Sequence, residues 1–309
     1  MKKVILIAIW LLAVHILLAG PAYRVSFHVK VGDEITNLER FSYFLLPGDT
    51  LVLSIADDKL EHYSIFSHNG DLISPLDDQW FYIAPEKKGY YKVLIQKQGS
   101  DENMLLQIFV MVPASNIRDG FLNGYRIGNY PDDNYKNKKN YQNPVGFIEV
   151  TQENKDVYLS PHFQLKQFLC KQQSDWPKYV VIKPRMLRKL ELVLEELNNA
   201  GVKANTLFLM SAYRTPYYNK AIGNVKYSRH IYGDAIDIYV DENHDAVMDD
   251  LNKDGITSMK DADVVQKIIE QIDSNPDNKE LIGGMGKYNK NAVHTYFIHI
   301  DTRGYKARW

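Results

Sequence analysis

The residues that could perform chemistry are concentrated in two short segments of the C-terminal half. In the stretch SRHIYGDAIDIYV, His230 and Asp237 stand seven residues apart, and the aspartate interrupts an apolar run. In FIHID, His299 and Asp301 lie on one face of an expected strand, because side chains alternate between faces. Gly233 supplies a turn that can fold His230 back beside Asp237. Two histidines and a carboxylate are a ligand set for Zn²⁺ that leaves a fourth position open for water, as in catalytic zinc sites.

A plain ion pair is the alternative interpretation of the same spacing. A histidine and an aspartate seven residues apart are common, and a buried pair of this kind needs no metal. A bound cation, however, would neutralise the charge of an aspartate buried in an apolar strand.

An acidic insertion at residues 241–261 separates Asp237 from His299. From Asp250 it reads D-x-N-x-D-G-x-x-S-x-x-D, the pattern of a twelve-residue calcium loop with Gly255 at the sharp turn. The expected Ca²⁺ ligands are Asp250, Asn252, Asp254, the Ile256 carbonyl, Ser258 and Asp261. An incomplete copy just upstream lacks the glycine and contains Asp241, Asn243, Asp245 and Asp249. It is either a companion calcium site or a solvated acidic loop.

The elements around these motifs predict an α+β domain at residues 158–309, with helices packed on a small antiparallel sheet. Three strands are expected at 206–214, 235–240 and 295–303. Leucines at helical spacing predict a helix from Pro184 to Gly201. Further helices are expected after Ser160-Pro161 and after Asp261, where each polar residue fits an N-cap.

The part of the chain before residue 158 has a different residue pattern. Residues 23–114 contain several short alternating runs separated by turns, which predicts an immunoglobulin-like β-sandwich. Residues 115–157 are rich in Asn, Asp, Lys, Tyr and Gly, which is typical of an extended linker. The chain is therefore expected to hold two domains of ordinary size within its 309 residues.

The N-terminus and the overall composition indicate where the protein works. Two lysines followed by an apolar run make residues 1–22 a signal peptide, with an uncleaved membrane anchor as the alternative. The protein is thus expected to be exported, to the periplasm or cell envelope, with membrane contact only through that segment. The net charge of -1 and the lack of a basic block argue against nucleic acid as the partner. The single cysteine, Cys170, excludes an internal disulfide and is expected to pack as a buried thiol.

Four blocks of the C-terminal half resemble a known family. SRHIYGDAID is similar to the S-x-H-x-x-G-x-A-x-D signature of the zinc D-Ala-D-Ala metallopeptidases, whose superfamily includes lysostaphin and Hedgehog. SAYRTPYYN resembles the upstream S-G-Y-R-S-x-x-x-N segment of that family. GGMGKY with FIHIDTRGYKARW is similar to the C-terminal block of the branch with murein endopeptidases, and LSPHFQLKQFLC to its opening helix. The blocks occur in the family's order and cover about residues 158–309.

The resemblance implies roles for individual residues. His230, Asp237 and His299 would be the zinc ligands, and Arg214 would bind the substrate and stabilise the oxyanion at the scissile carbonyl. The family's glutamate three positions before the last histidine is replaced here by Tyr296. Asp301 and His294 remain as candidates for the general base, and Asp301 could instead orient His299.

The resemblance implies an exported zinc metallopeptidase that hydrolyses peptidoglycan stem peptides next to D-amino acids. Both a D-Ala-D-Ala carboxypeptidase and a crosslink endopeptidase fit the sequence. The replacement of the glutamate by Tyr296 favours an alternative of another class, a catalytically inactive metal-containing module that binds cell wall or protein.

Overall fold

The computed structural model describes residues 23–309, apart from residue 77, residues 133–134 and residues 136–138. The expected signal segment at residues 1–22 lies outside the described residues. The described chain is mostly β-structure with few helices, arranged in several sheets.

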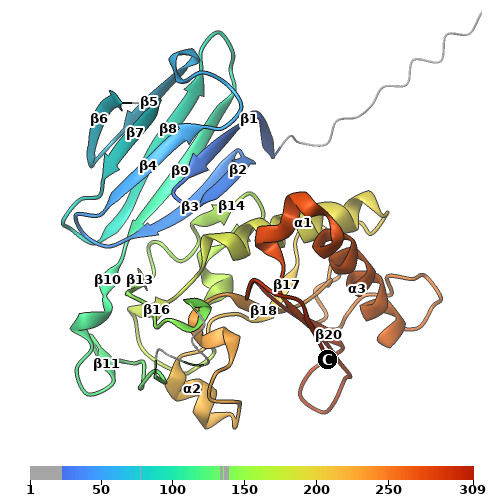
Figure 1. Cartoon of the computed structure of the whole chain (residues 1–309). Coiled ribbons are helices and arrows are strands. Elements are labelled where there is room, and N and C mark those ends of the chain that lie inside the picture. The colour runs from blue at the N-terminus through green and yellow to red at the C-terminus, as the bar shows by residue number, and fades with distance from the viewer. Residues whose placement is uncertain (1–22, 77, 133–134, 136–138) are drawn as a thin grey trace, which may run out of the picture.

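The strands after Tyr23 form two sheets that face each other at the upper left of Figure 1. The first sheet has the order β2-β1-β4-β7-β6, with bounds Glu34–Leu38, Arg24–Val31, Thr50–Ile55, Gln79–Ile83 and Asp71–Leu76. The second has the order β3-β9-β8-β5, with bounds Arg40–Leu45, Asn103–Val110, Gly89–Lys97 and Tyr63–Ser67. Alternating side chains such as Phe27, Val29 and Val31 fill the space between them.

The pairing of β3 with β9 is parallel, whereas the other strand pairs of these two sheets are antiparallel. Three of the alternating runs in the sequence, LVLSI at 51–55, YYKVLIQ at 90–96 and LLQIFVMV at 105–112, predict strands that coincide with β4, β8 and β9 to within two residues at each end. The immunoglobulin-like relationship itself stays a prediction.

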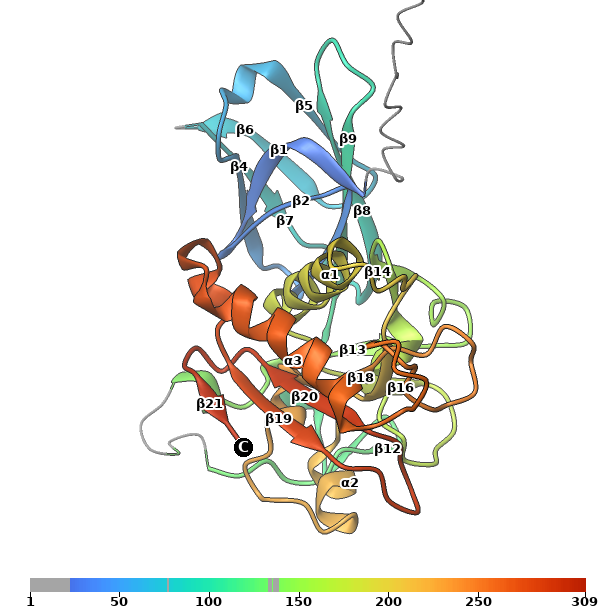
Figure 2. The same ribbon diagram turned by 90° about the vertical axis from the view of Figure 1, so that its right-hand side faces the viewer.

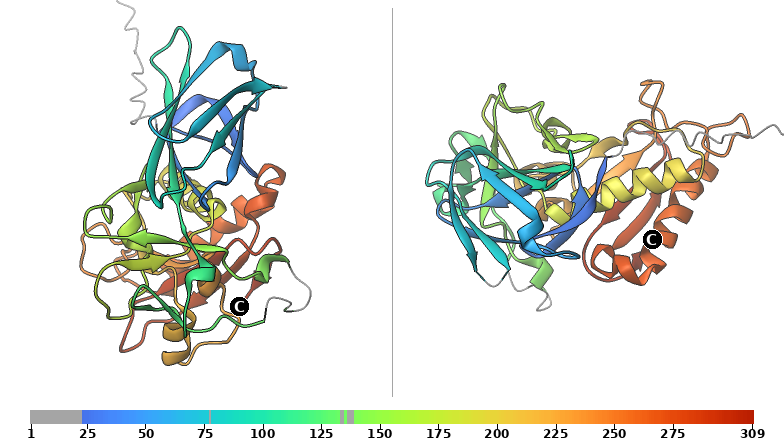
Figure 3. Two further views of the ribbon diagram at one scale, coloured as in Figure 1. Left: turned by 90° about the vertical axis from the view of Figure 1, so that its left-hand side faces the viewer. Right: turned by 90° about the horizontal axis from the view of Figure 1, so that it is seen from above.

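The described residues of segment 115–157 differ from the expected extended linker, because they pack against the C-terminal part (Figure 3, left). They contribute β11 (Phe121–Leu122), β12 (Tyr125–Arg126) and β13 (Gly146–Val150), and β13 pairs with β10 (Val112–Pro113) and β16 (Lys178–Val180). The many tyrosines of this segment explain the difference. Tyr130 is one of them, and its hydroxyl lies 2.9 Å from that of Tyr213 and donates to the Ile231 carbonyl at 3.0 Å.

The helix expected to start at Ser160-Pro161 is absent from the described chain, so this prediction was wrong. Ser160 instead ends β14 (Tyr158–Ser160), which pairs with β15 (Phe163–Gln164), and only a 3-10 turn follows at Leu165–Phe168. Gln164 and Gln167 cap that turn reciprocally, which sets its start four residues later than the serine predicts.

The C-terminal sheet has the order β17-β18-β20-β19-β21, with bounds Phe208–Ser211, Ala235–Tyr239, Phe297–Asp301, Gly284–Tyr288 and Ala307–Arg308. Its pairs are antiparallel except β19–β21. Helices α1 (Pro184–Asn199) and α3 (Met259–Ser274) lie side by side over one face (Figure 2). The short α2 (Pro216–Ala221) follows β17.

The start of α3 corrects one expected cap. Ser258 is the N-cap, and Asp261 stands three positions later and reaches back to the Ser258 N–H. This reciprocal capping box satisfies two free N–H groups at once, which a lone aspartate cap would not do.

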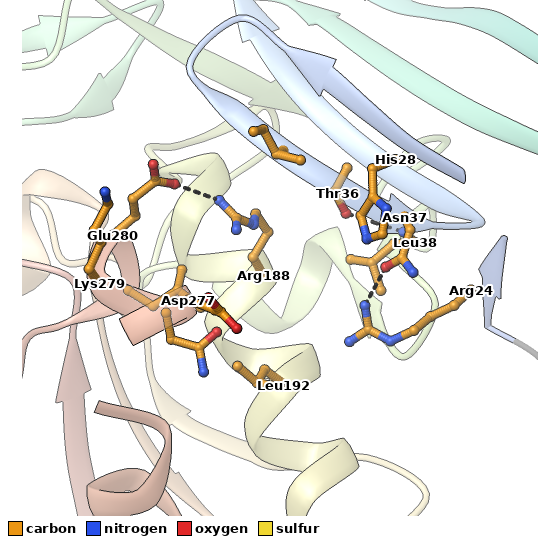
Figure 4. Close-up of a pocket in the computed structure, with 13 residues that line it drawn as sticks. Arg24, His28, Thr36, Asn37, Leu38, Arg188, Leu192, Asp277, Lys279 and Glu280 are labelled. Carbon is orange, nitrogen blue, oxygen red and sulfur yellow. Dashed lines mark hydrogen bonds and ion pairs between the residues drawn. The ribbon is translucent and has the colours of Figure 1, made fainter. Parts of the chain in front are cut away.

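Helix α1 of the C-terminal part also contacts the N-terminal sheets. Glu34 of β2 is buried and forms ion pairs with Arg188 and Arg185 of α1. A hollow of about 340 Å³ opens beside these pairs, lined by β1, β2, α1 and residues 277–281 (Figure 4). In Figure 4, Arg188 reaches toward Glu280 on its other side.

In the described part of the chain, every helix is too short or too polar to cross a membrane.

Candidate metal centre

Three side chains from two strands and one turn converge on one point of the C-terminal sheet. Asp237 on β18 stands directly opposite His299 on β20 in the strand register. His230 lies in a 3-10 turn at Arg229–Tyr232, which ends at Gly233 in the left-handed conformation with φ 73°. A Cβ at Gly233 would also collide with the Val181 backbone, so only glycine fits this turn. The turn folds His230 back over Asp237, as the sequence predicts.

The spacing of the three ligand atoms suits a zinc ion. Nε2 of His230 lies 3.2 Å from Nδ1 of His299 and 3.2 Å from Oδ1 of Asp237, and the last two atoms are 2.9 Å apart. Zinc holds such ligands at about 2.0–2.1 Å in a tetrahedron, whose edges are then roughly 3.3 Å long. The triangle therefore matches one face of a tetrahedral site and leaves the fourth corner free. Among the described residues, this is the only group of three or more His, Cys, Asp or Glu side chains that could hold a metal.

Each ligand is oriented by a second contact on its far side. Nδ1 of His230 donates to the Ala212 carbonyl at 2.7 Å, which leaves Nε2 as the acceptor that a metal needs. Nε2 of His299 lies 3.3 Å from a carboxylate oxygen of Asp301. Such outer partners fix the tautomer and raise the basicity of a ligating imidazole.

The electrostatics of the ligands favour the metal-binding forms of His230 and Asp237. Burial lowers the pKa of His230, which favours the neutral imidazole. Burial alone would raise the pKa of Asp237, but the two histidines outweigh it and hold the pKa well below its usual range. Burial would also lower the pKa of His299, but its hydrogen bonds to Asp237 and Asp301 raise it above its ordinary value. A metal therefore competes with a proton at His299.

Arg214 lies beside the cluster and pairs with the ligand aspartate. Its Nη2 donates to Oδ2 of Asp237 at 2.6 Å, and its Nε donates to Ser211 Oγ at 2.8 Å. Arg214 is 8% exposed and borders the cleft above the ligands. The structure thus brings Arg214 to the site, as the sequence predicts, and its ion pair orients Asp237.

The position of Asp301 matches the orienting role rather than that of a general base. The carboxylate is fully buried, contacts the nitrogen of His299 that faces away from the cluster, and accepts from the Gly284 N–H at 2.7 Å and from Arg303. Burial would raise the pKa of Asp301, but His299 and Arg303 hold it well below its usual range. A carboxylate with so low a pKa is a poor proton acceptor near neutral pH.

His294 is not brought to the cluster. Its Nε2 lies 2.8 Å from the Asn291 side-chain amide, and its Nδ1 lies 2.8 Å from the Thr295 carbonyl. It does not line the cleft that contains the three ligands.

The cleft over the ligands has a volume of about 460 Å³ and is rich in aromatic rings. Its lining consists of Tyr141, Arg214, Asn224, Val225, Tyr227, Ser228, Arg229, His230, Asp237, Tyr288, Phe297, His299, Arg303 and Trp309. In this set, the three ligands are the only Asp, Glu or His residues. Sequence reasoning missed the aromatic residues, because they come from five separate segments. The tyrosines of segment 115–157 were the available signal, since such a density of rings is unusual for a linker.

The two acidic loops of the insertion have the same backbone pattern. In the first, the Asp250 carboxylate accepts from the N–H groups of Asp254 and Gly255. In the second, Asp241 accepts from Asp245 and Ala246 in the same way. The two loops are offset by nine residues, so Ala246 corresponds to Gly255, and both residues have a positive φ. The acidic side chains of the first loop accept backbone N–H groups and do not form a three-ligand cluster, so calcium stays a prediction.

Comparison with known proteins identifies one family. Residues 161–275 match the family model described as Peptidase M15. The matched range includes Arg214, His230 and Asp237, whereas His299 lies beyond it. None of the curated proteins compared with the chain matches it.

Proposed function

We propose that the protein is an exported zinc metallopeptidase that acts on peptidoglycan, because residues 161–275 match the family model described as Peptidase M15. The proposed substrates are stem peptides, cut at a bond next to a D-amino acid. The observation that carries the proposal is the His230–Asp237–His299 triangle, which fits three corners of a tetrahedral zinc site and opens into a cleft.

When bound, zinc supplies a Lewis acid that polarises the scissile carbonyl and lowers the pKa of water. Arg214 keeps Asp237 ionised and oriented through its Nη2. The remaining N–H groups of this guanidinium can donate to the carbonyl oxygen of a substrate in the cleft. Asp301 and the Ala212 carbonyl hold the two imidazoles in place. The burial of the ligands limits access of bulk water to the reacting centre.

One observation favours a second candidate, a metal-containing module that binds its target without turnover. The described lining of the cleft offers no carboxylate or imidazole besides the three ligands, so no conventional general base stands ready. The two sheets before residue 114 are proposed to hold either form of the protein on the cell wall or on a partner.

A digest separates the two candidates. The protein, loaded with zinc, is incubated with purified peptidoglycan, with and without a zinc chelator, and the released fragments are weighed by mass spectrometry. Chelator-sensitive release is expected, and the fragment masses identify the bond. Free D-alanine indicates a carboxypeptidase, and separated stem peptides indicate an endopeptidase. Absence of release from folded, zinc-loaded protein would reject hydrolysis and leave the binding module.

A further inference from the structure

One wall of the metal cleft is formed by three aromatic residues to which no role has yet been assigned. They are Trp309, Tyr288 and Phe297, called here the aromatic wall. The rings of Tyr288 and Phe297 stack at 4.5 Å with their planes 3° apart. Nε1 of Trp309 donates to the Tyr288 hydroxyl at 2.7 Å, which joins the indole to the stack. The indole centroid lies 5.3 Å from the imidazole centroid of His299. The aromatic wall therefore stands directly beside a proposed zinc ligand.

The backbone around Trp309 is held on both sides. Its N–H donates to the Met285 carbonyl, and its own carbonyl accepts from the Lys287 N–H, both at 3.3 Å. The preceding Arg308 is anchored to Glu270 and Asp273 of α3, at 2.6 Å in each case. The position of the indole is thus set before any ligand arrives, which reduces the entropy lost on binding.

Gly286 makes room for this arrangement. It lies opposite His299 in the register of β19 and β20. A Cβ at Gly286 would overlap the indole of Trp309. The glycine allows the indole to lie close against β19, next to the strand that carries His299, where any larger residue would push it away.

The exposure of the aromatic wall shows which rings are available to a ligand. Phe297 is 6% exposed and serves as backing, whereas Tyr288 is 37% exposed and Trp309 is 50% exposed. A half-exposed indole 5.3 Å from the ring of His299 lies within reach of a peptide whose scissile bond is at the metal. Aromatic residues buried by a ligand contribute more than other residues to binding.

The chemistry of the aromatic wall selects an uncharged, apolar group. The guanidinium of Arg303 lies over the Trp309 ring at 5.2 Å and is already paired with Asp301. An anionic substrate group would meet aromatic carbon there and would lose hydration, and a cationic group would compete with Arg303 for the face of the indole.

We propose that Trp309, held by Tyr288 and by the space at Gly286, binds the apolar side chain of the substrate residue on the His299 side of the scissile bond. The inference rests on the proposed function for the identity of the substrate, a stem peptide. It gives Trp309 a role in substrate affinity and selectivity, separate from metal binding.

Kinetics of full-length Trp309→Ala, Trp309→Phe and the control Trp176→Phe test the proposal. Trp176 lies outside the cleft lining. With a stem pentapeptide ending in D-alanyl-D-alanine or a crosslinked muropeptide, whichever the wild type cleaves, Trp309→Ala should raise KM about tenfold or more with a smaller effect on kcat. Trp309→Phe should fall between this variant and wild type, and Trp176→Phe should match wild type. Zinc content should stay near one per chain in all of them.

Selectivity gives a second readout. Wild type should prefer a peptide with an apolar side chain beside the scissile bond over one with a charged side chain, and Trp309→Ala should lose most of that preference. An unchanged KM and preference in Trp309→Ala would overturn the proposal. Loss of zinc or of thermal stability in that variant, without a change of KM, would show that Trp309 is only structural.

A binding experiment keeps the inference testable if hydrolysis itself fails. The Trp309 contribution to fluorescence is the difference between wild type and Trp309→Phe, and its half-exposed indole should be quenched by iodide. Stem pentapeptide added to the zinc-loaded protein should cover the Trp309 indole and so reduce the quenching of its fluorescence by iodide. Protection without hydrolysis would support the aromatic wall and reject the peptidase, whereas lack of protection at saturating peptide would reject the wall.

Discussion

The carboxylate of Asp301 contacts Nε2 of His299, while Nδ1 of the same ring faces Asp237 and His230. The imidazole therefore has one side for the metal and one side for its orienting partner. This relationship separates two roles that the sequence left open for Asp301, because a group behind the ring cannot reach the open corner of the metal site.

Asp301→Asn should lower activity by weakening zinc binding rather than by removing a proton acceptor. The amide keeps the size of the carboxylate but loses its charge, so zinc affinity should fall by about 10- to 100-fold. Activity should recover when zinc is added in excess. Zinc affinity by competition with a chromophoric chelator and turnover at saturating zinc are the measurements. Turnover that stays lost at full zinc occupancy would return Asp301 to the role of general base.

His294→Ala is the companion variant, because His294 is held by Asn291 and Thr295 away from the cleft. Its turnover and zinc content should remain within about twofold of wild type, as expected of a substitution away from the site. A large loss of turnover at normal zinc content would show that the side chain swings over the metal during the reaction.

Zinc should stabilise the folded protein, and this effect should vanish in His230→Ala. Free zinc at about 1,000 times its Kd adds roughly 4 kcal/mol to the free energy of unfolding. The thermal midpoint should therefore rise with zinc and fall with chelator in wild type but not in His230→Ala. His162→Ala, which removes a histidine outside the metal cluster, should keep the zinc-dependent rise. An equal response to zinc in wild type and His230→Ala would place the metal elsewhere.

Glu270→Gln should make the protein less stable at neutral pH and should have little effect in strong acid. Hydrogen bonds from Arg308 lower the pKa of Glu270 to about 2, below its ordinary value of 4.5. Between these two values the unfolded chain binds more protons, so the contribution is full above about pH 5 and is lost as the pH falls toward 2. Because Glu270 is partly exposed, its ionised form should contribute only about 1–2 kcal/mol to the free energy of unfolding. Chemical denaturation at pH 7 and pH 3 measures it, and Lys306→Met, which removes the more exposed partner, should cost less.

Glu34→Ala should loosen the contact between the N-terminal sheets and α1. The carboxylate is 2% exposed and is shared by Arg185 and Arg188, so its removal leaves these arginines with only the longer pairs to Asp33 and Glu280. A loss of about 3 kcal/mol in the free energy of unfolding is expected. Glu61→Ala, at an exposed pair with Lys59, should change stability by less than about 0.5 kcal/mol. Equal effects of the two variants would contradict a structural role for the buried pair.

Calcium should raise the thermal midpoint of the zinc-loaded protein if the Asp250 loop binds it. Asp254→Ala should remove this rise, because it deletes a ligand position, whereas Asp245→Ala in the incomplete copy should have a smaller effect. A midpoint that does not respond to calcium would reject the calcium site and leave two loops held by their own hydrogen bonds.

The sequence by itself determined the elements and motifs whose causes are local. The leucine spacing predicts α1, the short apolar run AIDIY predicts β18, and Gly233 predicts the turn that returns His230 to Asp237. The family resemblance rests on these local motifs, and the match to Peptidase M15 confirms it. Even so, local signals misplaced a helix at Ser160 and the cap of α3, because reciprocal capping boxes decided both.

Only the tertiary structure decided what lies around the motifs. Asp301 took its place behind His299 because the pairing of β18 with β20 and the contact with Arg303 fix the ring and the carboxylate together. The cleft wall joins Trp309 to Gly286 and Tyr288, and its other side includes Tyr141 from a segment expected to be a linker. Such contacts join residues far apart in the chain, and no periodicity or spacing records them, because they depend on how the sheet, the helices and the preceding segment pack.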